Sequence, residues 1–314
     1  MLDTVKLGFK ISPSNEQLEK WELKVNSKYE PTRTTRFMSL SWLRFEEGSI
    51  RVKYYPQNVN TRPEPLLLIE MSLPKLVYGN NIQEIFSTSR AIEKGNQIIG
   101  QYSHIPRVDL NEGILYRIDL CHNFQVGAYV SEWIRQLYKL EYPRRKTKPY
   151  YPSQGVQYFS KRASLSFYNK EDECKNVSAH GILRMEASYR DKNQIGKLVG
   201  KSLATIGDFT SEGVVSHLNG LLQKLGIKDQ APADSLGALR ILMNQYSSEQ
   251  AVRLNGFLMA RQIASSKELK AMGMVKQTIS RSTKQIRAAG LSMCVADNVF
   301  PLPKLVINPR STVE

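Results

Sequence analysis

A tyrosine placed close to a lysine is the pair of residues with the clearest chemical potential in this sequence. Tyr168 lies in an alternating segment, residues 163–170, whose apolar side chains point to one side and whose polar side chains, including Tyr168 and Lys170, point to the other. A phenol oxygen can attack phosphorus, and a nearby ammonium group can hold the phosphate. The alternative is a partly buried tyrosine beside a solvated lysine.

Three further alternating segments each carry an acid on their polar face. They are Leu66–Leu73 with Glu70, Leu115–Asn123 with Asp119 and Ile182–Arg190 with Glu186. Together the segments predict one sheet whose apolar face is covered by helices and whose other face gathers the acids and Tyr168. Carboxylates without a thiolate or histidine partner suit Mg²⁺ or Mn²⁺. The alternative is that Arg117 pairs with Asp119 and Arg184 with Glu186, as exposed ion pairs that contribute about 0–1 kcal/mol.

Four short motifs occur in an order that points to a known family. They are Ile69-Glu70-Met71-Ser72-Leu73-Pro74-Lys75-Leu76, Tyr116-Arg117-Ile118-Asp119-Leu120, Tyr168-Asn169-Lys170 with Glu173, and Leu183-Arg184-Met185-Glu186. On these motifs the chain resembles the gene II replication proteins of filamentous phages, and it is similar to the related initiators of small rolling-circle plasmids. The resemblance covers about Leu66 to Arg190, with a looser echo in residues 300–305.

The resemblance implies an enzyme that starts rolling-circle replication by metal-dependent, strand-specific nicking and rejoining of DNA. Tyr168 would form a 5′-phosphotyrosyl intermediate, and Glu70, Asp119 and Glu186 would bind or support Mg²⁺ or Mn²⁺. Lys170 would stabilise charge on the phosphate or lower the pKa of the phenol. The chain lacks the pair of metal-binding histidines typical of many other replication nickases, and we interpret His122 as structural.

The resemblance also implies partners and a location. Origin DNA, single-stranded or locally melted, is the expected substrate, and the free 3′ hydroxyl would prime a host polymerase. A host helicase and a second copy of the chain are further candidate partners, in the cytoplasm of a bacterial host. The alternative function is that of a non-enzymatic, sequence-specific DNA-binding regulator whose acidic cluster is purely structural.

Composition favours a polyanionic partner. The 314 residues include 44 Lys and Arg against 29 Asp and Glu, which gives a net charge of +15. No apolar stretch approaches the roughly 18 residues that a membrane span requires, and the N-terminal sequence does not read as a signal peptide. The cysteines at 121, 174 and 294 are far apart and predict no disulfide framework.

The pattern along the chain predicts an α+β fold, with a mostly antiparallel sheet that has helices packed on one face, followed by a helical C-terminal subdomain. We place a nicking domain at residues 1–207 and the helical domain at 208–314. Early strands are expected at Val5–Ile11 and Phe37–Tyr55, the latter with a turn at Glu47-Gly48-Ser49. Helices are expected near Gln83–Gln97 and over residues 126–138.

A basic and aromatic segment, Tyr142–Pro152, lies before the tyrosine strand. Its prolines predict a loop without regular structure. The side chains expected to contact DNA phosphates or to stack on unpaired bases are Arg144, Arg145, Lys146, Lys148, Tyr150 and Tyr151. The alternative is a solvated surface loop. A second tyrosine, such as Tyr158, or a water could perform the second strand transfer.

The last third of the sequence reads as helices. Stripes at residues 214–225 and 248–264 precede a short helix with a glycine turn at residues 266–273, and then a basic helix near Thr278–Ala289. This order predicts a helix-turn-helix in which Arg281, Lys284 and Arg287 contact DNA, or else an ordinary helical subdomain. Residues 301–309 would form a wing strand or pack on the sheet. Residues 196–202 resemble a phosphate-binding loop, but three residues separate the glycines where that loop needs four.

Overall fold

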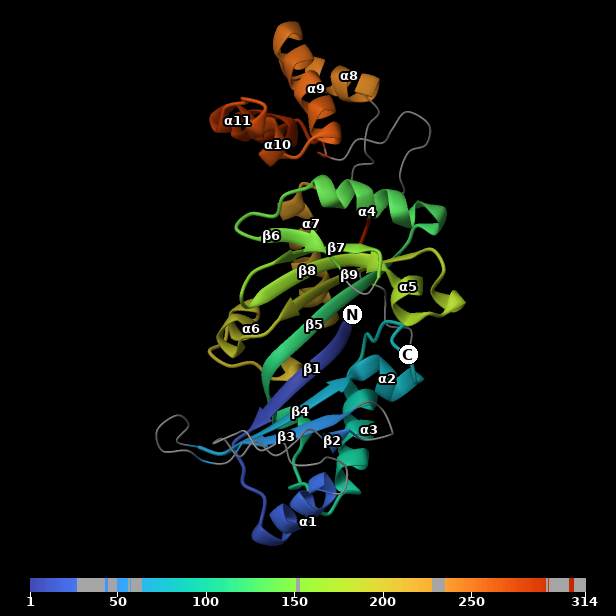
Figure 1. Ribbon diagram of the computed structural model, residues 1–314, viewed down its shortest axis with the longest axis vertical. Coiled ribbons are helices and arrows are strands. Elements are labelled where there is room, and N and C mark those ends of the chain that lie inside the picture. Colours follow the sequence, from blue (N-terminus) through green and yellow to red (C-terminus); the bar gives the residue numbers. More distant parts are fainter. Residues whose placement is uncertain are drawn as a thin grey trace. The chain divides into compact units, whose positions relative to one another are not determined.

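The computed structural model describes residues 1–26, 43–44, 50–55, 57, 64–150, 153–227, 235–291, 293 and 305–307 (Figure 1). Its contacts divide the chain into two units. Unit 1 comprises residues 1–121, 187–214 and 311–314, and unit 2 comprises residues 122–186 and 215–310. The predicted boundary between residues 207 and 208 follows the change to helical sequence and stays a prediction.

Unit 1 is built on antiparallel strands with two helices against them. Its elements are β1 (Leu2–Phe9), α1 (Asn15–Asn26), β2 (Leu43–Arg44), β3 (Arg51–Tyr55), β4 (Leu66–Ser72), α2 (Leu73–Tyr78), α3 (Ser89–Gly100), η1 (Leu110–Glu112), most of β5 (Ile114–Gln125), the end of β9 (Ile182–Tyr189), α6 (Lys192–Leu198) and η4 (Ile206–Asp208). Strand β1 pairs antiparallel with both β4 and β5, so it lies inside the sheet.

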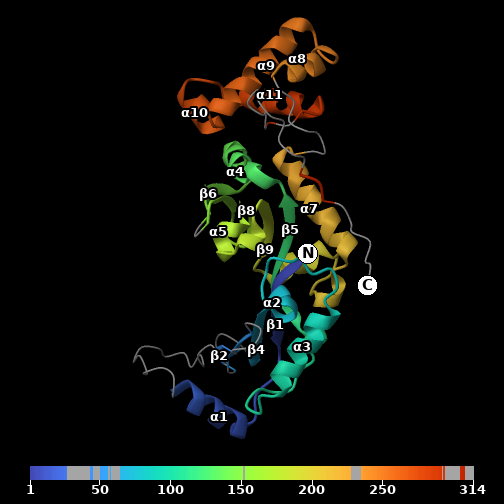
Figure 2. The ribbon, with the colours of Figure 1, turned by 90° about the vertical axis from the view of Figure 1, so that its right-hand side faces the viewer.

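Unit 2 combines strands, a covering helix and a group of helices. Its elements are η2 (Gly127–Tyr129), α4 (Val130–Lys139), β6 (Lys146–Pro149), β7 (Gly155–Phe159), β8 (Ala163–Asn169), α5 (Lys170–Cys174), η3 (Val177–Ala179), most of β9 and of α7 (Ser211–Leu225), α8 (Ser235–Met243), α9 (Ser248–Ile263), α10 (Ser266–Ala271) and α11 (Lys276–Ala288). Figure 2 shows α8 to α11 gathered in one cluster. The hydrogen-bonded order of the described strands is β2-β3-β4-β1-β5-β9-β8-β7-β6.

The core of each unit follows from the alternation in its strands. In unit 1, Val5, Leu7 and Ile69 are fully buried, and α2 packs against β1, β4 and α3. In unit 2, α4 packs against β7 and β8 through its apolar stripe. Burying these apolar faces is the main favourable term that holds the strands in register. The predicted α+β class, with a mostly antiparallel sheet and a helical C-terminal region, is confirmed.

Two sequence-based element predictions were wrong in part. The helix expected near Gln83–Gln97 begins only at Ser89, because Ile85 forms a β-bridge with Leu2 and its carbonyl accepts a hydrogen bond from the N-terminal amine. The segment expected to be an irregular loop contains β6, which pairs with β7. Pro149 is tolerated because β6 is the last strand in the order, where a missing backbone N–H breaks no inner ladder.

The strand that carries Tyr168 ends one residue earlier than the alternation predicts. Asn169 caps α5 by accepting hydrogen bonds from the backbone N–H groups of Glu171 and Asp172. Lys170 is therefore the first residue of a helix and not part of the strand. The expected side-by-side placement of Tyr168 and Lys170 on one strand face is wrong for this reason.

The helical predictions for the last third are confirmed in α7, α9, α10 and α11, with left-handed glycines at 226, 273 and 290 ending three of them. Helix α8 was not predicted. Gly196 lies within α6, so the segment at 196–202 does not have the form of a phosphate-binding loop. Of residues 301–309, only 305–307 are described; they form no strand, and the Ile307 carbonyl accepts from Asn219 of α7.

Several sequence-based predictions fall on residues outside the described part of the chain. These are Tyr151, Cys294, the turn at Glu47-Gly48-Ser49, residues 37–42 and residues 300–304. Cys121 and Cys174 carry no disulfide. Within the residues that the structure describes, no helix is long and apolar enough to cross a membrane.

A half-buried histidine should make the stability of the protein depend on pH. The pKa of His217 is lowered to about 4, because burial disfavours its charged form and the charges of Lys224 and Arg145 add to this effect. Unfolded histidine binds a proton near pH 6.5, whereas the folded one does so only near pH 4. This group should therefore lower the free energy of unfolding as the pH falls from about 6.5 to about 4.

Urea denaturation over this pH range measures the effect. His217→Gln should flatten the dependence, and His180→Gln, at an exposed histidine, should retain it. Equal slopes for wild type and His217→Gln would contradict the assignment.

Candidate active site and nucleic-acid interface

A row of charged residues crosses the strands of unit 1. Lys6 on β1 lies opposite Glu70 on β4 and opposite Arg117 on β5. The Lys6 Nζ atom is 2.6 Å from Glu70 Oε2, and Arg117 Nη1 is 3.2 Å from Glu70 Oε1. Directly opposite residues on neighbouring strands bring their side chains together, so the register of the sheet assembles this row.

Arg117 also binds Asp119, two residues further along the same strand face. Its Nη2 atom is 2.6 Å from Asp119 Oδ2, and its Nε atom is 3.1 Å from Asp119 Oδ1, which is a bidentate ion pair. The guanidinium therefore joins Glu70 and Asp119. The ion pair between Arg117 and Asp119 that the sequence offered as an alternative is present, although Asp119 is buried and not exposed.

Besides Glu70 and Asp119, a further acid near Asp119 was not predicted from the sequence. Asp3 is buried on β1, and its Oδ1 atom accepts a hydrogen bond from the Ser72 hydroxyl at 3.2 Å. The predicted strand began at Val5, but β1 begins at Leu2, and a register shift between Leu2 and Val5 breaks the alternation. The apolar Leu2 was the available signal that the strand starts earlier.

The electrostatics of Asp119 reflect its burial. Loss of solvent raises the pKa of this carboxyl, and the neighbouring charge of Asp3 acts in the same direction. Arg117 and the Ser188 hydroxyl oppose the shift without cancelling it. Asp119 therefore takes up a proton more readily than an ordinary aspartate.

The fit of these residues to a divalent ion is mixed. Their donors are carboxylate and hydroxyl oxygens, which is the set that Mg²⁺ and Mn²⁺ prefer. In the part of the chain that the structure describes, however, no group of three or more His, Cys, Asp or Glu side chains is arranged to hold a metal. Arg117 is the cation that Glu70 and Asp119 share. The metal role of Glu70, Asp119 and Glu186 stays a prediction.

In unit 2, the phenol of Tyr168 meets a carboxylate. The Tyr168 hydroxyl donates a hydrogen bond to Glu186 Oε2 over 3.0 Å, so these two predicted site residues share a sheet face. The face is not open, because Tyr168 is only 1% exposed. The ring of Tyr150 lies parallel to that of Tyr168, with a centroid distance of 4.5 Å and an interplanar angle of 5°.

A glycine sets how closely the chain approaches Tyr168. Gly155 on β7 is the residue directly opposite Tyr168 on β8. A Cβ atom at this position would lie 2.5 Å from the Phe167 carbonyl oxygen and 2.7 Å from the Tyr168 Cβ. The missing side chain therefore lets the two strands pack tightly behind the tyrosine.

Lys170 is buried close to the tyrosine ring. Its Nζ atom is 6.0 Å from the centroid of the Tyr168 ring and forms an ion pair with Glu173. The side chain is fully buried, so Glu173 supplies the opposite charge that a buried ammonium requires. Its predicted contact with phosphate stays a prediction.

Other side chains considered from the sequence have structural partners. His122 is buried edge-to-face against Phe124, with centroids 4.8 Å apart, as the structural interpretation expects. Tyr158 is fully buried, and its hydroxyl donates to the Leu137 carbonyl. Tyr158 is therefore a poor candidate for a second nucleophile.

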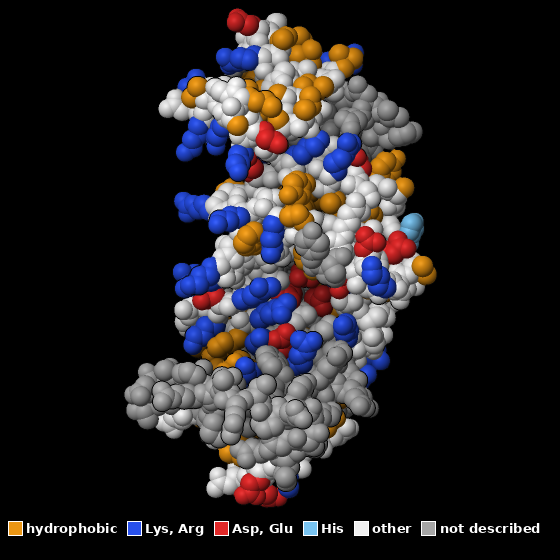
Figure 3. Space-filling view, in the orientation of Figure 1, with side chains coloured by type: hydrophobic (Ala, Val, Ile, Leu, Met, Phe, Trp, Pro, Cys, Tyr) orange, Lys and Arg blue, Asp and Glu red, His pale blue; other side chains and the backbone are white. Residues whose placement is uncertain are grey.

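The residues predicted to contact DNA are mostly basic and exposed. Arg144, Lys146, Lys148, Arg281 and Lys284 are exposed, and Figure 3 shows many Lys and Arg side chains on the face in view. Two predicted contacts have partners inside the protein. The Arg145 guanidinium lies 4.3 Å from the centroid of the Tyr142 ring, and Arg287 Nη2 donates to the Leu225 carbonyl at 3.3 Å.

Comparison with protein families matches residues 1–216 to the family described as the N-terminal part of the replication-associated gene II protein. The chain belongs to this family. The resemblance to the gene II replication proteins is thereby confirmed. A search of curated proteins finds no match. Among solved structures, a rolling circle replication initiator protein from Geobacillus stearothermophilus is similar at 12% identity over 72% of this chain and 84% of its own, with a TM-score of 0.35.

This replication-associated protein should lose stability when the shared guanidinium is removed. Arg117→Leu leaves the buried Asp119 without its ion-pair partner and leaves Glu70 with Lys6, so we expect a loss of about 3 kcal/mol in the free energy of unfolding. Urea denaturation measures it. Arg135→Leu, which breaks an exposed pair with Glu132, is the control and should cost less than about 1 kcal/mol. Adding Asp119→Asn to Arg117→Leu should recover part of the loss; equal losses for Arg117→Leu and Arg135→Leu would contradict this role.

Proposed function

We propose that this replication-associated protein initiates rolling-circle replication by nicking one strand of origin DNA and rejoining it through Tyr168. The hydrogen bond from the Tyr168 hydroxyl to Glu186 Oε2, at 3.0 Å, is the observation that carries the proposal. A phenol is a weak nucleophile at neutral pH, and an adjacent carboxylate that can accept its proton makes it a better one. Family membership supports a role in replication.

The reaction follows from these two groups. As the Tyr168 oxygen bonds to phosphorus, its proton passes to Glu186, and the bond from phosphorus to the 3′ oxygen breaks. The 3′ oxygen takes a proton from solvent and leaves as a hydroxyl, Glu186 later returns its proton to solvent, and the 5′ phosphate stays on the tyrosine. The reverse attack by a 3′ hydroxyl rejoins the strand. Because the phosphotyrosine keeps the energy of the phosphodiester bond, rejoining needs no nucleotide hydrolysis.

In this proposal Lys170 stabilises the negative charge that develops on the phosphate or on the attacking oxygen. Lys170 lies beside the Tyr168 ring and is held there by Glu173. Glu70, Asp119 and Glu186 are the residues that would hold Mg²⁺ or Mn²⁺. When bound, such an ion supplies charge that polarises the scissile phosphate. Arg117 contacts both oxygens of Asp119 and one oxygen of Glu70, so a bound ion would have to compete with Arg117 for these donors.

The substrate of this reaction is single-stranded or locally melted origin DNA. Tyr168 is covered, and the ring stacked on it belongs to Tyr150. An unpaired base offers the same kind of flat surface as that ring, so it can take over the stacking while the phosphate reaches the phenol. The released 3′ hydroxyl then primes a host polymerase. A host helicase and a second copy of the chain complete the partners that we propose, in a bacterial host cytoplasm.

A non-enzymatic DNA-binding regulator is the second candidate function. It is favoured by the short helix α10, the turn at Gly273 and the basic helix α11, which together have the order of a helix-turn-helix. A regulator of this kind would bind origin DNA but leave a supercoiled circle intact in the presence of Mg²⁺.

The nucleophile is tested with Tyr168→Phe. This variant should bind DNA as wild type does but form no covalent adduct with a suicide oligonucleotide, because only the attacking oxygen is removed. Mass spectrometry of the adduct in wild type should identify the peptide that carries Tyr168. Adduct formation by Tyr168→Phe at the wild-type rate would disprove the assignment, and absence of nicked circles with wild type would favour the regulator.

Metal dependence is tested by chelation and by pH. Excess EDTA should stop nicking. At limiting Mg²⁺, nicking should decrease as the pH falls, and the decrease should begin at a higher pH than for an ordinary aspartate, because burial raises the pKa of Asp119 and its protonated form binds no cation. Added Mg²⁺ should shift the midpoint to lower pH. Full nicking activity in EDTA would reject the metal.

A further inference from the structure

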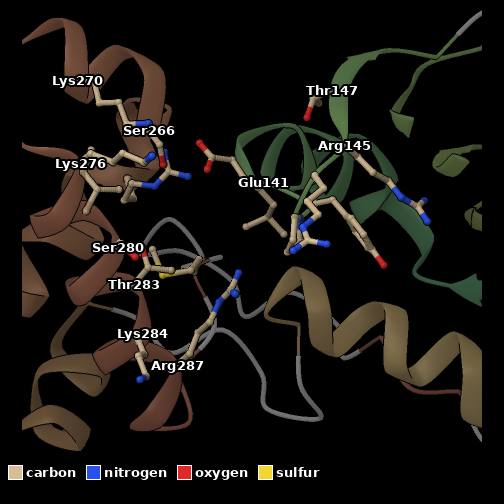
Figure 4. Close-up of a pocket in the computed structure, with 17 residues that line it drawn as sticks. Glu141, Arg145, Thr147, Ser266, Lys270, Lys276, Ser280, Thr283, Lys284 and Arg287 are labelled. Atoms are coloured by element: carbon tan, nitrogen blue, oxygen red, sulfur yellow. The ribbon is translucent and has the colours of Figure 1, made fainter. Parts of the chain in front are cut away.

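A pocket of about 630 Å³ lies within unit 2, away from any residue assigned above to the nicking chemistry. One wall is formed by residues 140–147, which follow α4, and the other by side chains of α9, α10 and α11 (Figure 4). Every lining residue belongs to unit 2. The pocket is thus lined by two segments that were predicted from the sequence to be separate DNA-contacting surfaces.

The pocket is strongly cationic. Arg144 from one wall and Lys270, Lys276 and Lys284 from the other are exposed, whereas Glu141 is the acidic residue among those described as lining it. None of these four cations forms an ion pair with a carboxylate in the described part of the chain. The pocket is therefore lined by more positive than negative side chains, and this excess charge favours binding of an anion.

Two further arginines that line the pocket, Arg261 and Arg287, form hydrogen bonds with neighbouring segments of unit 2. Arg261 donates to the carbonyls of Ala264, at 2.8 Å, and Lys139, at 2.9 Å, and the second bond joins α9 to the end of α4. Arg287 donates to the Leu225 carbonyl at the end of α7. Burial lowers the pKa of both guanidinium groups, and the charge of Glu141 opposes this shift. These partners leave Arg144, Lys270, Lys276 and Lys284 as the groups that a ligand would meet.

One face of α11 lines the pocket. Lys276, Ser280, Lys284 and Arg287 recur at helical spacing on it, while Ile279 and Ile286 are buried. Arg281 is exposed but does not line the pocket. A ligand in the pocket therefore meets lysines and the hydroxyls of Ser280 and Thr283 on α11, and the helix face with Arg281 is a separate surface.

The turn that carries Arg144 is strained. Arg144 has a φ of 60°, in the left-handed region where a glycine or asparagine would be less costly. Backbone strain of this kind tends to occur at functional positions, where the side chain is needed. Arg144 therefore adopts a costly backbone conformation while its side chain lines the cationic pocket.

We propose that this pocket binds the phosphodiester backbone of duplex DNA; the inference rests on the proposed function and names a surface of unit 2 that holds the duplex during nicking. Its charge matches phosphate, and its hydroxyls can donate to phosphate oxygens. The aromatic residue among the described lining residues, Tyr142, is only 8% exposed and lies under Arg145. Without a ring for bases to stack on, the pocket suits duplex backbone better than single strands.

The test measures binding of a labelled duplex of arbitrary sequence by fluorescence anisotropy at increasing NaCl. All proteins carry Tyr168→Phe, so cleavage plays no part, and the adduct assay of the preceding section reports separately on the nicking chemistry. Lys276→Ala with Lys284→Ala should weaken binding at least about tenfold at moderate salt and lower the slope of log affinity against log salt by about two. The matched control is Arg253→Ala with Lys267→Ala, which removes two exposed cations of α9 and α10 outside the pocket.

The control pair should change affinity by less than about twofold. Equal losses for the two pairs, or an unchanged salt slope for the pocket pair, would overturn the proposal. So would an equal loss of affinity for a single strand of the same length. Arg144→Gly separates loss of binding from loss of stability. It relieves the strained turn, so the melting temperature should stay the same or rise while duplex binding weakens. A lower melting temperature with unchanged binding would also overturn the proposal.

Discussion

One guanidinium between two carboxylates is the interaction on which the acidic part of this protein depends. Arg117 binds Asp119 through two nitrogens and reaches Glu70 on another strand through a third contact. Asp119 is buried, so its charge would be costly without this partner. The register of β1 between β4 and β5 brings the three residues together, with Lys6 completing the row. Sheet register and local electrostatics are thus coupled, because a slipped strand would separate Glu70 from Lys6 and Arg117.

The tyrosine site depends on a different kind of constraint. Tyr168 is placed by the strand ladder, by the close approach of Gly155 and by the cap that Asn169 provides for α5. The cap turns the chain at Lys170, so the ammonium lies beside the ring and pairs with Glu173 one helical turn later. Side chains that looked like neighbours on one strand are in fact held by a strand and a helix that meet.

Alternation predicted the four strands and placed Tyr168 and Glu186 on the same face, because period-two patterns report directly which side chains share a face. Alternation could not reveal Asp3, since a register shift near the start of β1 hides it. It also placed Lys170 on a strand, because a capping asparagine at the end of an alternating run is a weak signal. The burial of the polar face and the basic pocket depend on contacts between distant segments, which no local pattern contains.

The backbone around Tyr168 is tied on several sides. Asn169 donates its N–H to the Gln154 carbonyl, the strand is paired at Gly155, and the helix begins at the next residue. The main chain has little freedom to travel, so only side-chain torsions can reorient the hydroxyl. A DNA 5′ end attached to Tyr168 in the proposed reaction would therefore be held at a nearly fixed position. During the proposed strand exchange, the departing and incoming 3′ ends of the DNA would have to move, while the attached 5′ end would stay in place.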